Sequence, residues 1–138
     1  MKTAPALYNP TVLDHFLNPR NVGDLPHPDA LGQAGEPACG DTMRLTLRIQ
    51  RGKIIDARFR VFGCAAAIAS SSMATQLLKG KTLAQARRFT NRQIVTALGG
   101  LPPAKIQCSV LAAQALQAAL QDYDTRHPAT RTPRRSKS

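Results

Sequence analysis

Three cysteines occupy three separate motifs of the chain, and their side chains are the ones best suited to chemistry. Cys39 lies in Pro-Ala-Cys-Gly-Asp, Cys64 in Phe-Gly-Cys-Ala, and Cys108 at the end of Leu-Pro-Pro-Ala-Lys-Ile-Gln-Cys. An odd number of thiols at long spacings suits neither a disulfide framework nor a CxxC finger. Thiolates are soft ligands, so the pattern favours three cysteines that converge on one metal ion, with a fourth ligand to be identified. Three buried, unreactive thiols are the alternative, because free cysteine is often a core residue.

A carboxylate, Asp41, follows Cys39 by two positions. In an extended segment, side chains two residues apart point to the same side, so this carboxylate can reach the same centre as the sulfur. Spacing alone does not decide between this ligand role and a turn-forming role beside Gly40.

Cys64 and Cys108 are each predicted to lie at the start of a helix. A helix N-terminus carries partial positive charge and unpaired N–H groups, and both favour thiolate over thiol. Lys105, three residues before Cys108, adds a positive charge. We therefore expect both thiols to be better nucleophiles and metal ligands than an exposed cysteine.

Two runs of alternating apolar and polar residues, 43–49 and 55–61, flank the turn Gln50-Arg51-Gly52-Lys53. This pattern predicts an antiparallel hairpin with one solvent-exposed face. In the second run we expect the core-facing residues to be Ile55, Ala57, Phe59 and Val61. Residues 18–37 have the composition of an irregular connection, in which residues 30–34 are a candidate edge strand.

Helices are predicted in the sequence both before and after the hairpin. Asn9 and Pro10 begin a short one that stops before Pro19, with a shared apolar face made by Val12, Leu13, Phe16 and Leu17. Further helices are predicted over residues 65–79, after capping boxes at Thr82 and Thr90, and over residues 106–123. The order predicts an α+β fold: a single domain with a small antiparallel sheet of about three strands and helices packed on one face.

Length and charge limit the possible functions. The chain has 138 residues, enough for one domain, and a net charge of +11. Five of these charges lie in residues 126–138, predicted to be a basic, disordered tail that is a solvated appendage or a loose contact for acidic partners. Nucleic-acid binding is not expected, because the chain offers no Trp, two Tyr and four Phe for base stacking. No membrane span or signal peptide is apparent, so we expect a reducing cytoplasm, where free thiols persist.

Several longer stretches stand in a defined order: Asn18-Pro-Arg-Asn-Val-Gly23, Pro37-Ala-Cys-Gly-Asp41, Asp56-Ala-Arg-Phe59, Gly63-Cys64, Ala67-Ile-Ala-Ser-Ser-Ser72, and Leu101-Pro-Pro-Ala-Lys105 leading into Ile106-Gln-Cys-Ser109. Together they resemble the IscU/NifU N-terminal-type scaffold proteins of iron–sulfur cluster assembly. The similarity runs from about Tyr8 to Asp124. Residues 1–125 are therefore expected to form the scaffold domain.

The resemblance implies a non-enzymatic scaffold that builds a [2Fe–2S] cluster from iron and persulfide sulfur. It also implies three kinds of partner: a cysteine desulfurase that delivers the sulfur, an Hsp70/J-protein pair, and apo-proteins that receive the cluster. It assigns ligand and sulfur-acceptor roles to Cys39, Cys64 and Cys108, while Asp41 makes the cluster labile. We expect Cys108, close to Lys105, to be the main persulfide acceptor, and the protein to be a monomer or weak dimer.

A second implied site is the Hsp70 recognition segment, with Ala104 where the family usually has Val. Its residues are Leu101, Pro102, Pro103, Ala104 and Lys105. Two prolines are expected to hold it extended and preformed, which would lower the cost of docking. A rigid loop that positions Cys108 is a compatible interpretation.

One position, Gln107, departs from the family, which usually has His directly before the third cysteine. An amide oxygen is a hard, neutral donor, so Gln107 is at most a weak ligand, and Asp41 is the expected fourth ligand for zinc or a weakly held cluster. The histidines His15, His27 and His127 are expected at the surface. SufU-type relatives also lack that histidine and are zinc-dependent sulfur acceptors, although they carry an insertion before the last cysteine and lack the Leu-Pro-Pro-x-Lys segment. A zinc-bound sulfur acceptor that partners a desulfurase is therefore the alternative function.

Overall fold

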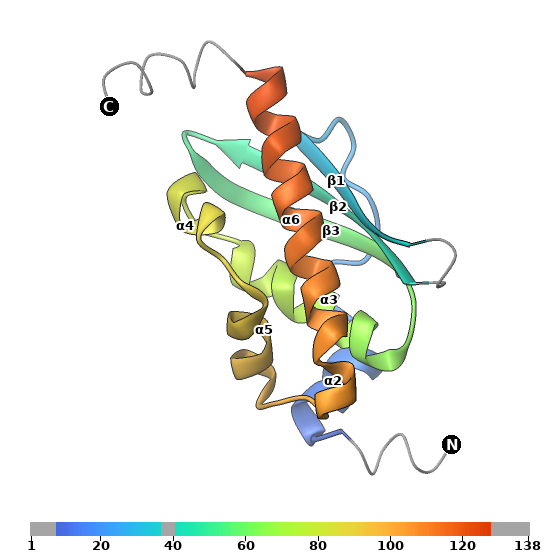
Figure 1. The fold of residues 1–138 in the computed structure, drawn as a ribbon. Helices are drawn as coiled ribbons and strands as arrows, with labels where there is room; N and C mark the ends of the chain where they lie inside the picture. The colour runs from blue at the N-terminus through green and yellow to red at the C-terminus, as the bar shows by residue number, and fades with distance from the viewer. Residues whose placement is uncertain (1–7, 37–40, 128–138) are drawn as a thin grey trace.

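The protein is a three-stranded sheet with helices on one face, as described by a computed structural model that covers residues 8–36 and 41–127 (Figure 1). Its elements in chain order are α2 (Pro10–Leu17), β1 (Ala30–Glu36), β2 (Asp41–Gln50), β3 (Lys53–Phe62), α3 (Ala65–Leu78), α4 (Leu83–Arg87), α5 (Asn91–Leu98), the 3₁₀ turn η1 (Pro103–Lys105) and α6 (Ile106–Arg126). The strands are antiparallel in the order β1-β2-β3. Helix α6 packs on β1 and β2, and α3 packs on β3. The predicted α+β fold, including its edge strand, is confirmed.

The hairpin between β2 and β3 turns at Arg51 and Gly52, whose φ angles are 52° and 75°. Two successive positive φ angles are typical of the tight two-residue turn that joins antiparallel strands. The register then shifts, so that Ile49 pairs with Ile54 and leaves Ile55 as an extra residue in β3. Ile54 is consequently fully buried, whereas Ile55 is 46% exposed. The prediction that Ile55 faces the core is wrong because this irregularity reverses the alternation.

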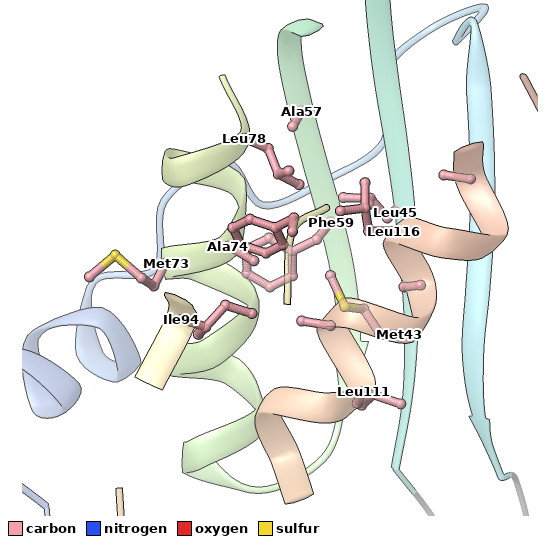
Figure 2. Close-up of a cluster of buried hydrophobic side chains, with 14 of the residues drawn as sticks. Met43, Leu45, Ala57, Phe59, Met73, Ala74, Leu78, Ile94, Leu111 and Leu116 are labelled. Carbon is pink, nitrogen blue, oxygen red and sulfur yellow. The ribbon is translucent and has the colours of Figure 1, made fainter. Parts of the chain in front are cut away.

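The hydrophobic core lies between the sheet and helices α3, α5 and α6 (Figure 2). Figure 2 labels core side chains from both strands of the hairpin and from the helices, including Leu45 of β2, Phe59 of β3, Ile94 of α5 and Leu116 of α6. These four side chains are 0–1% exposed. Burying each contributes roughly 1.5–3 kcal/mol of transfer free energy, so the core holds the helices firmly against the sheet.

The connection between α2 and β1 covers part of the face of the sheet that points away from the helices. It also lies along the free edge of β3. Phe59 donates its backbone N–H to Asn21 and accepts one from Gly23, with N–O distances of 2.9 and 2.8 Å. Farther along, Leu25 donates its backbone N–H to the hydroxyl of Thr46 at 3.1 Å, and both residues are buried. The face predicted to be exposed is therefore covered at Thr46.

Helix α2 packs against α3 through a stripe that contains His15 and Val12. His15 is only 4% exposed, and its Nδ1 lies 2.8 Å from the Ser72 hydroxyl, which also accepts the backbone N–H of Arg20. Burial, followed by the charge of Arg20, lowers the pKa of His15, so the ring is neutral at pH 7. The prediction that His15 lies at the surface is wrong. Leu17 is 69% exposed and does not join the buried face, because the stripe is centred on His15.

The short helices begin where the sequence predicts. Thr82 and Gln85 exchange hydrogen bonds between side chain and backbone, at 3.1 and 2.9 Å, which is a complete capping box. Thr90 donates its backbone N–H to the Gln93 side chain at 2.9 Å. Helix α5 ends at Gly99, which has a φ of 84°.

Helix α6 continues to Arg126, beyond its predicted end at Tyr123. Arg126 pairs with Asp122 at 3.1 Å, and the ring of His127 stacks on Tyr123 with centroids 4.2 Å apart. His127 is thus half-buried on the helix end and is not a free surface residue. No helix among the described residues is long and apolar enough to cross a membrane. Residues 128–138 of the predicted basic tail lie outside the described residues.

Helix α6 approaches β1 most closely at Gly32. A β-carbon at this position would lie 2.2 Å from the carbonyl oxygen of Ala115 and 2.3 Å from the backbone nitrogen of Ala119. Backbone atoms cannot rotate away as a side chain can, so only glycine permits this contact. The position of α6 on the sheet, and with it the position of Cys108, depends on this close approach.

We predict that Gly32→Ala lowers the free energy of unfolding by about 1–3 kcal/mol or more, because the added carbon forces α6 away from β1. Urea denaturation followed by circular dichroism measures this change. Gln33→Ala, at the exposed next position of the same strand, is the control and should change stability by less than about 0.5 kcal/mol. Equal stability of Gly32→Ala and the parent protein would contradict the proposed role of Gly32.

Candidate metal centre

Three elements begin at one corner of the fold and bring a carboxylate and two thiols together. Asp41 is the first residue of β2, Cys64 is the N-cap of α3 directly after β3, and Cys108 lies in the first turn of α6. Because β2 and β3 are antiparallel, the start of β2 lies beside the end of β3, where Thr42 pairs with Phe62. The ligand atoms of Asp41, Cys64 and Cys108 all lie within 4.8 Å of one another. This donor set and spacing suit a single zinc or iron ion.

Two glycines leave the space that Asp41 needs. A β-carbon on Gly63 would lie 3.1 Å from Asp41 Oδ1 and from the Cβ atom of Ala67, both tighter than an ordinary contact. A β-carbon on Gly35 would lie 2.2 Å from the backbone oxygen of Asp41, and the φ of Gly35 is +112°. Glycine at these positions therefore allows the carboxylate to approach Cys64. The local motif Phe-Gly-Cys-Ala does not indicate that Asp41 is the neighbour of Gly63, because Asp41 lies on a different strand.

The sulfur atoms of Cys64 and Cys108 lie 3.4 Å apart, and both residues are half-buried. Burial, followed by the hydrogen bond and the charge of Cys64, raises the pKa of Cys108 to about 12. The positive charge of Lys105 acts in the opposite direction, and Asp41 adds to the increase. The expectation that Cys108 is a ready thiolate is therefore wrong, because lost hydration and acidic neighbours outweigh the helix start.

The segment before α6 gives a second reason why Cys108 is not a ready thiolate. Pro102 has φ and ψ angles of −56° and 143°, as in polyproline, but Pro103–Lys105 form the 3₁₀ turn η1. In this turn Lys105 donates its N–H to Pro102 at 2.7 Å, and Ile106 donates its own to Pro103. The first N–H groups of α6 are thus partly used within the turn. The prediction of a fully extended segment holds at Pro102 and is wrong from Pro103 onward, because proline also fits the first turn of a helix.

A cavity of about 480 Å³ opens beside the three ligands. Asp41, Cys64, Cys108 and Lys105 line it, together with Gly35, Ala104, Gln107, Val110, Leu111 and Gln114. Gln107 is exposed and Lys105 half-buried. The volume exceeds what one ion requires, since a water molecule occupies about 30 Å³ of liquid. The cavity therefore has room for a small inorganic group of several atoms.

Two further ligands are predicted, Cys39 and Gln107, and Gln107 is exposed at the wall of the same cavity. Cys39 lies outside the described residues, so its expected role is untested by the structure. Among the described residues, the cluster of potential metal ligands contains Asp41, Cys64 and Cys108 and no histidine. His27 is exposed on the connection before β1, as predicted.

Tyr8 is a neighbour of the thiols that the sequence analysis did not assign to the site. It is 9% exposed, and burial raises the pKa of its phenol. The charges of Cys64 and Cys108 raise this pKa further, whereas Lys105 lowers it. Tyr8 is therefore within electrostatic range of all three groups. A lone tyrosine before a helix carries no motif, so only tertiary packing reveals this proximity.

Comparisons with known proteins place these residues in context. Residues 7–130 match the NifU-like N terminal domain family. The iron–sulfur cluster assembly scaffold protein IscU of Azotobacter vinelandii is 52% identical over 120 residues, which cover 84% of this chain and 93% of that protein. IscU 1 of Archaeoglobus fulgidus, which bears the same scaffold description, is 50% identical over 117 residues, covering 85% of this chain and 76% of that protein.

Solved structures show the same fold. A candidate iron–sulfur cluster assembly scaffold for the SUF system, from Fervidobacterium islandicum, superposes with a TM-score of 0.68 at 19% identity and covers 83% of this chain and 97% of that one. The N-terminal part of a NifU-like protein from Brucella abortus has a TM-score of 0.56 at 23% identity, with 90% of this chain and 89% of that one covered.

We predict that alkylation of Cys108 by iodoacetamide, in protein kept with a metal chelator, is slow at pH 8. Its rate should rise about tenfold per pH unit without a plateau up to pH 10, because the pKa of about 12 leaves little thiolate below that pH. Peptide mass spectrometry gives the rate, and the unfolded protein is the control. Cys64→Ser should shift the profile to lower pH. A plateau near pH 8–9 in the folded parent protein would contradict the raised pKa.

Proposed function

Because this chain belongs to the NifU-like N-terminal domain family, we propose that it is a scaffold on which an iron–sulfur cluster is assembled and from which the cluster is handed to acceptor proteins. The observation that carries the proposal is the convergence of Asp41, Cys64 and Cys108 beside a cavity of about 480 Å³. The scaffold descriptions of relatives at 50–52% identity support it. In this proposal iron must be bound and released, which suits ligands that line a cavity.

Iron and the finished cluster are cargo in this proposal. Cys64 and Cys108 supply thiolates, Asp41 supplies a carboxylate oxygen, and Cys39 is the proposed third thiolate of a [2Fe–2S] site. Iron–sulfur clusters are normally held by thiolates, so a site with an oxygen ligand binds the cluster less tightly. A weakly held cluster is what a donor protein needs, because the acceptor must be able to remove it.

The neutral thiol of Cys108 indicates how loading begins. With its pKa at about 12, Cys108 keeps its proton until a positive charge enters the site. A coordinating thiol is deprotonated by the metal, so iron binding would create the thiolate and release the proton. Lys105 lowers the pKa of Cys108 and is proposed to assist when sulfur is delivered to it.

The proposed partners are a cysteine desulfurase, a chaperone pair and the acceptor proteins. Leu101 and Pro102 are half-buried, while Pro103 and Ala104 are exposed and accessible to an Hsp70. This segment is continuous with the first turn of α6, so its capture would pull directly on Cys108. We assign no catalytic turnover to the protein, and we assign residues 1–125 to the scaffold and residues 126–138 to a basic tail.

The proposal includes a compartment and an assembly state. Two free thiols 3.4 Å apart persist only where the surroundings are reducing, so we propose a cytoplasmic location. A monomer or weak dimer is proposed, because the cavity must stay accessible to several partners in turn.

A zinc-bound sulfur acceptor is the second candidate function. The observation that favours it is Gln107, which lines the cavity where the family usually has a histidine ligand. Zinc needs only four ligands in a tetrahedral arrangement, and three thiolates with one carboxylate can supply them. The two candidates differ in outcome: a scaffold gains visible absorption on reconstitution, whereas a zinc-bound acceptor takes up sulfur and stays colourless.

We predict up to one zinc ion per chain after aerobic purification. Asp41→Ala should weaken zinc binding by about tenfold or more, because it removes a ligand, and Gln107→Ala should weaken it less. Competition with a chromophoric chelator measures both. Equal losses would show that Gln107, or a water molecule that it holds, is a ligand.

We predict that anaerobic reconstitution with iron, cysteine and a desulfurase gives a visible cluster spectrum that decays quickly in air. Gln107→His should lengthen the lifetime several-fold, because imidazole is a better iron ligand than an amide. The matched control is Gln114→His, which adds the same ring elsewhere on the cavity wall and should leave the lifetime unchanged. A parent cluster that outlasts that of Gln107→His would contradict this account, and no spectrum in either protein would contradict the scaffold function.

A further inference from the structure

We propose that Cys64 is a resolving thiol, which can release sulfur bound on Cys108 as sulfide by forming a disulfide between the two residues. The inference rests on the proposed function in one respect, the delivery of a persulfide sulfur to Cys108. It assigns Cys64 a covalent role in addition to metal binding. The observation that carries it is the distance of 3.4 Å between the two sulfur atoms.

The step balances without any further reactant. Cys64 Sγ attacks Cys108 Sγ of the persulfide, a Cys64–Cys108 bond forms, and the bond from Cys108 Sγ to the outer sulfur breaks. The outer sulfur leaves with the electron pair as hydrosulfide and takes up the proton that Cys64 gives up. Cys64 is oxidised, and the outer sulfur is reduced to sulfide. One persulfide and one thiol thus give one disulfide and one hydrogen sulfide molecule.

The geometry favours this reaction because the two thiols are held close before any sulfur arrives. Cys64 is fixed as the N-cap of α3 and Cys108 lies in the first turn of α6, and both helices are anchored in the same core. A disulfide bond is about 2.0 Å long, so the two sulfur atoms, 3.4 Å apart, need to approach by only about 1.4 Å. Two groups held in contact react as if at a very high concentration.

The surroundings also accommodate the leaving sulfur. Both thiols line the cavity of about 480 Å³, so the cavity offers space for an outer sulfur on Cys108. Lys105 lines the same cavity and offers a positive charge to the departing hydrosulfide. Asp41 lies within 4.8 Å of both thiols but has no sulfur and cannot replace Cys64 in the step.

A consequence follows for the order of loading. The disulfide removes two of the three described ligands, so sulfide released in this way leaves the protein unable to hold a cluster. When both thiols are already bound to iron, they are not free to pair with each other. Iron bound first therefore protects the two ligands from pairing, whereas sulfur before iron leads to free sulfide and an oxidised protein.

The experiment uses the full chain, treated with a chelator and a reductant, desalted under argon, and loaded by two routes. One route is a desulfurase with cysteine, and the other is inorganic polysulfide, which needs no partner. Trypsin separates the thiols, with Cys39 in residues 21–44, Cys64 in residues 61–79 and Cys108 in residues 106–126. Mass spectrometry follows the peptides over time, and a colorimetric assay measures released sulfide.

The parent protein should show a transient persulfide on residues 106–126, followed by a cross-link to residues 61–79 and one sulfide per cross-link. Cys64→Ser should keep the persulfide on Cys108 at least tenfold longer and release correspondingly less sulfide. Its thermal unfolding, followed by circular dichroism, tests whether it is folded, and the cross-link in the parent protein does not depend on any variant.

Three results separate the possibilities. A persulfide on Cys108 that persists in the parent protein without a cross-link overturns the inference. A cross-link to residues 21–44 that Cys39→Ser abolishes also overturns it, by making Cys39 the resolving thiol. A cross-link after polysulfide but no sulfur on Cys108 from the desulfurase supports the resolving role of Cys64 and overturns the proposed delivery of sulfur by that partner.

Discussion

The backbone contact between α6 and β1 at Gly32 is the constraint on which the site depends. Ala115 and Ala119 approach the strand so closely that no side chain fits between them. An α-helix is stiff and rises about 1.5 Å per residue, so this contact also sets where the helix begins. Cys108 lies two turns before Ala115 and is thereby placed beside Cys64. A helix held only by long side chains could slide by more than the 3.4 Å that separates the two sulfur atoms.

The same packing that places the thiols also determines their chemistry. Cys108 is half-buried in the first turn of α6, and lost hydration is the largest cause of its high pKa. The neighbouring groups Cys64 and Asp41 raise the pKa of Cys108 further, and Lys105 offsets only part of this increase. The site is therefore most stable either with a neutral Cys108 thiol or with a cation that compensates several negative charges at once. Proton release and metal binding are consequently coupled.

Beside this rigid corner lies a segment that joins the site to the surface. The turn η1 and the start of α6 are one continuous stretch, and its outer residues Pro103 and Ala104 are exposed. A partner that grips this stretch acts on the same backbone that carries Cys108. His15 and Ser72 join α2 to α3 through a buried hydrogen bond, so α2 supports the helix that begins at Cys64. The site thus combines support from the buried packing of α2 and α3 with an exposed segment, η1, that a partner can reach.

Much of this fold could be predicted because its signals are local. The period-two alternation of β2 and β3, the capping boxes at Thr82 and Thr90, and the order of strands before helices each depend on near neighbours in the chain. The prediction failed where a distant contact overrides a local pattern. Ile55 became exposed because the strand register shifts beside Ile49, and His15 became buried because α3 offers it a hydroxyl partner.

The sequence by itself determined which residues could do chemistry, because cysteine and aspartate are recognisable as ligands wherever they stand and their motifs match a family. It also determined the fold class through periodicity and capping. Only the tertiary structure decided that Asp41, Cys64 and Cys108 share one centre, with ligand atoms within 4.8 Å of one another. It also decided that Tyr8 lies within electrostatic range of the thiols and that the pKa of Cys108 is raised. The physical reason is that distance, hydration and mutual charge belong to the packed state, in which residues far apart in the chain exclude water from one another.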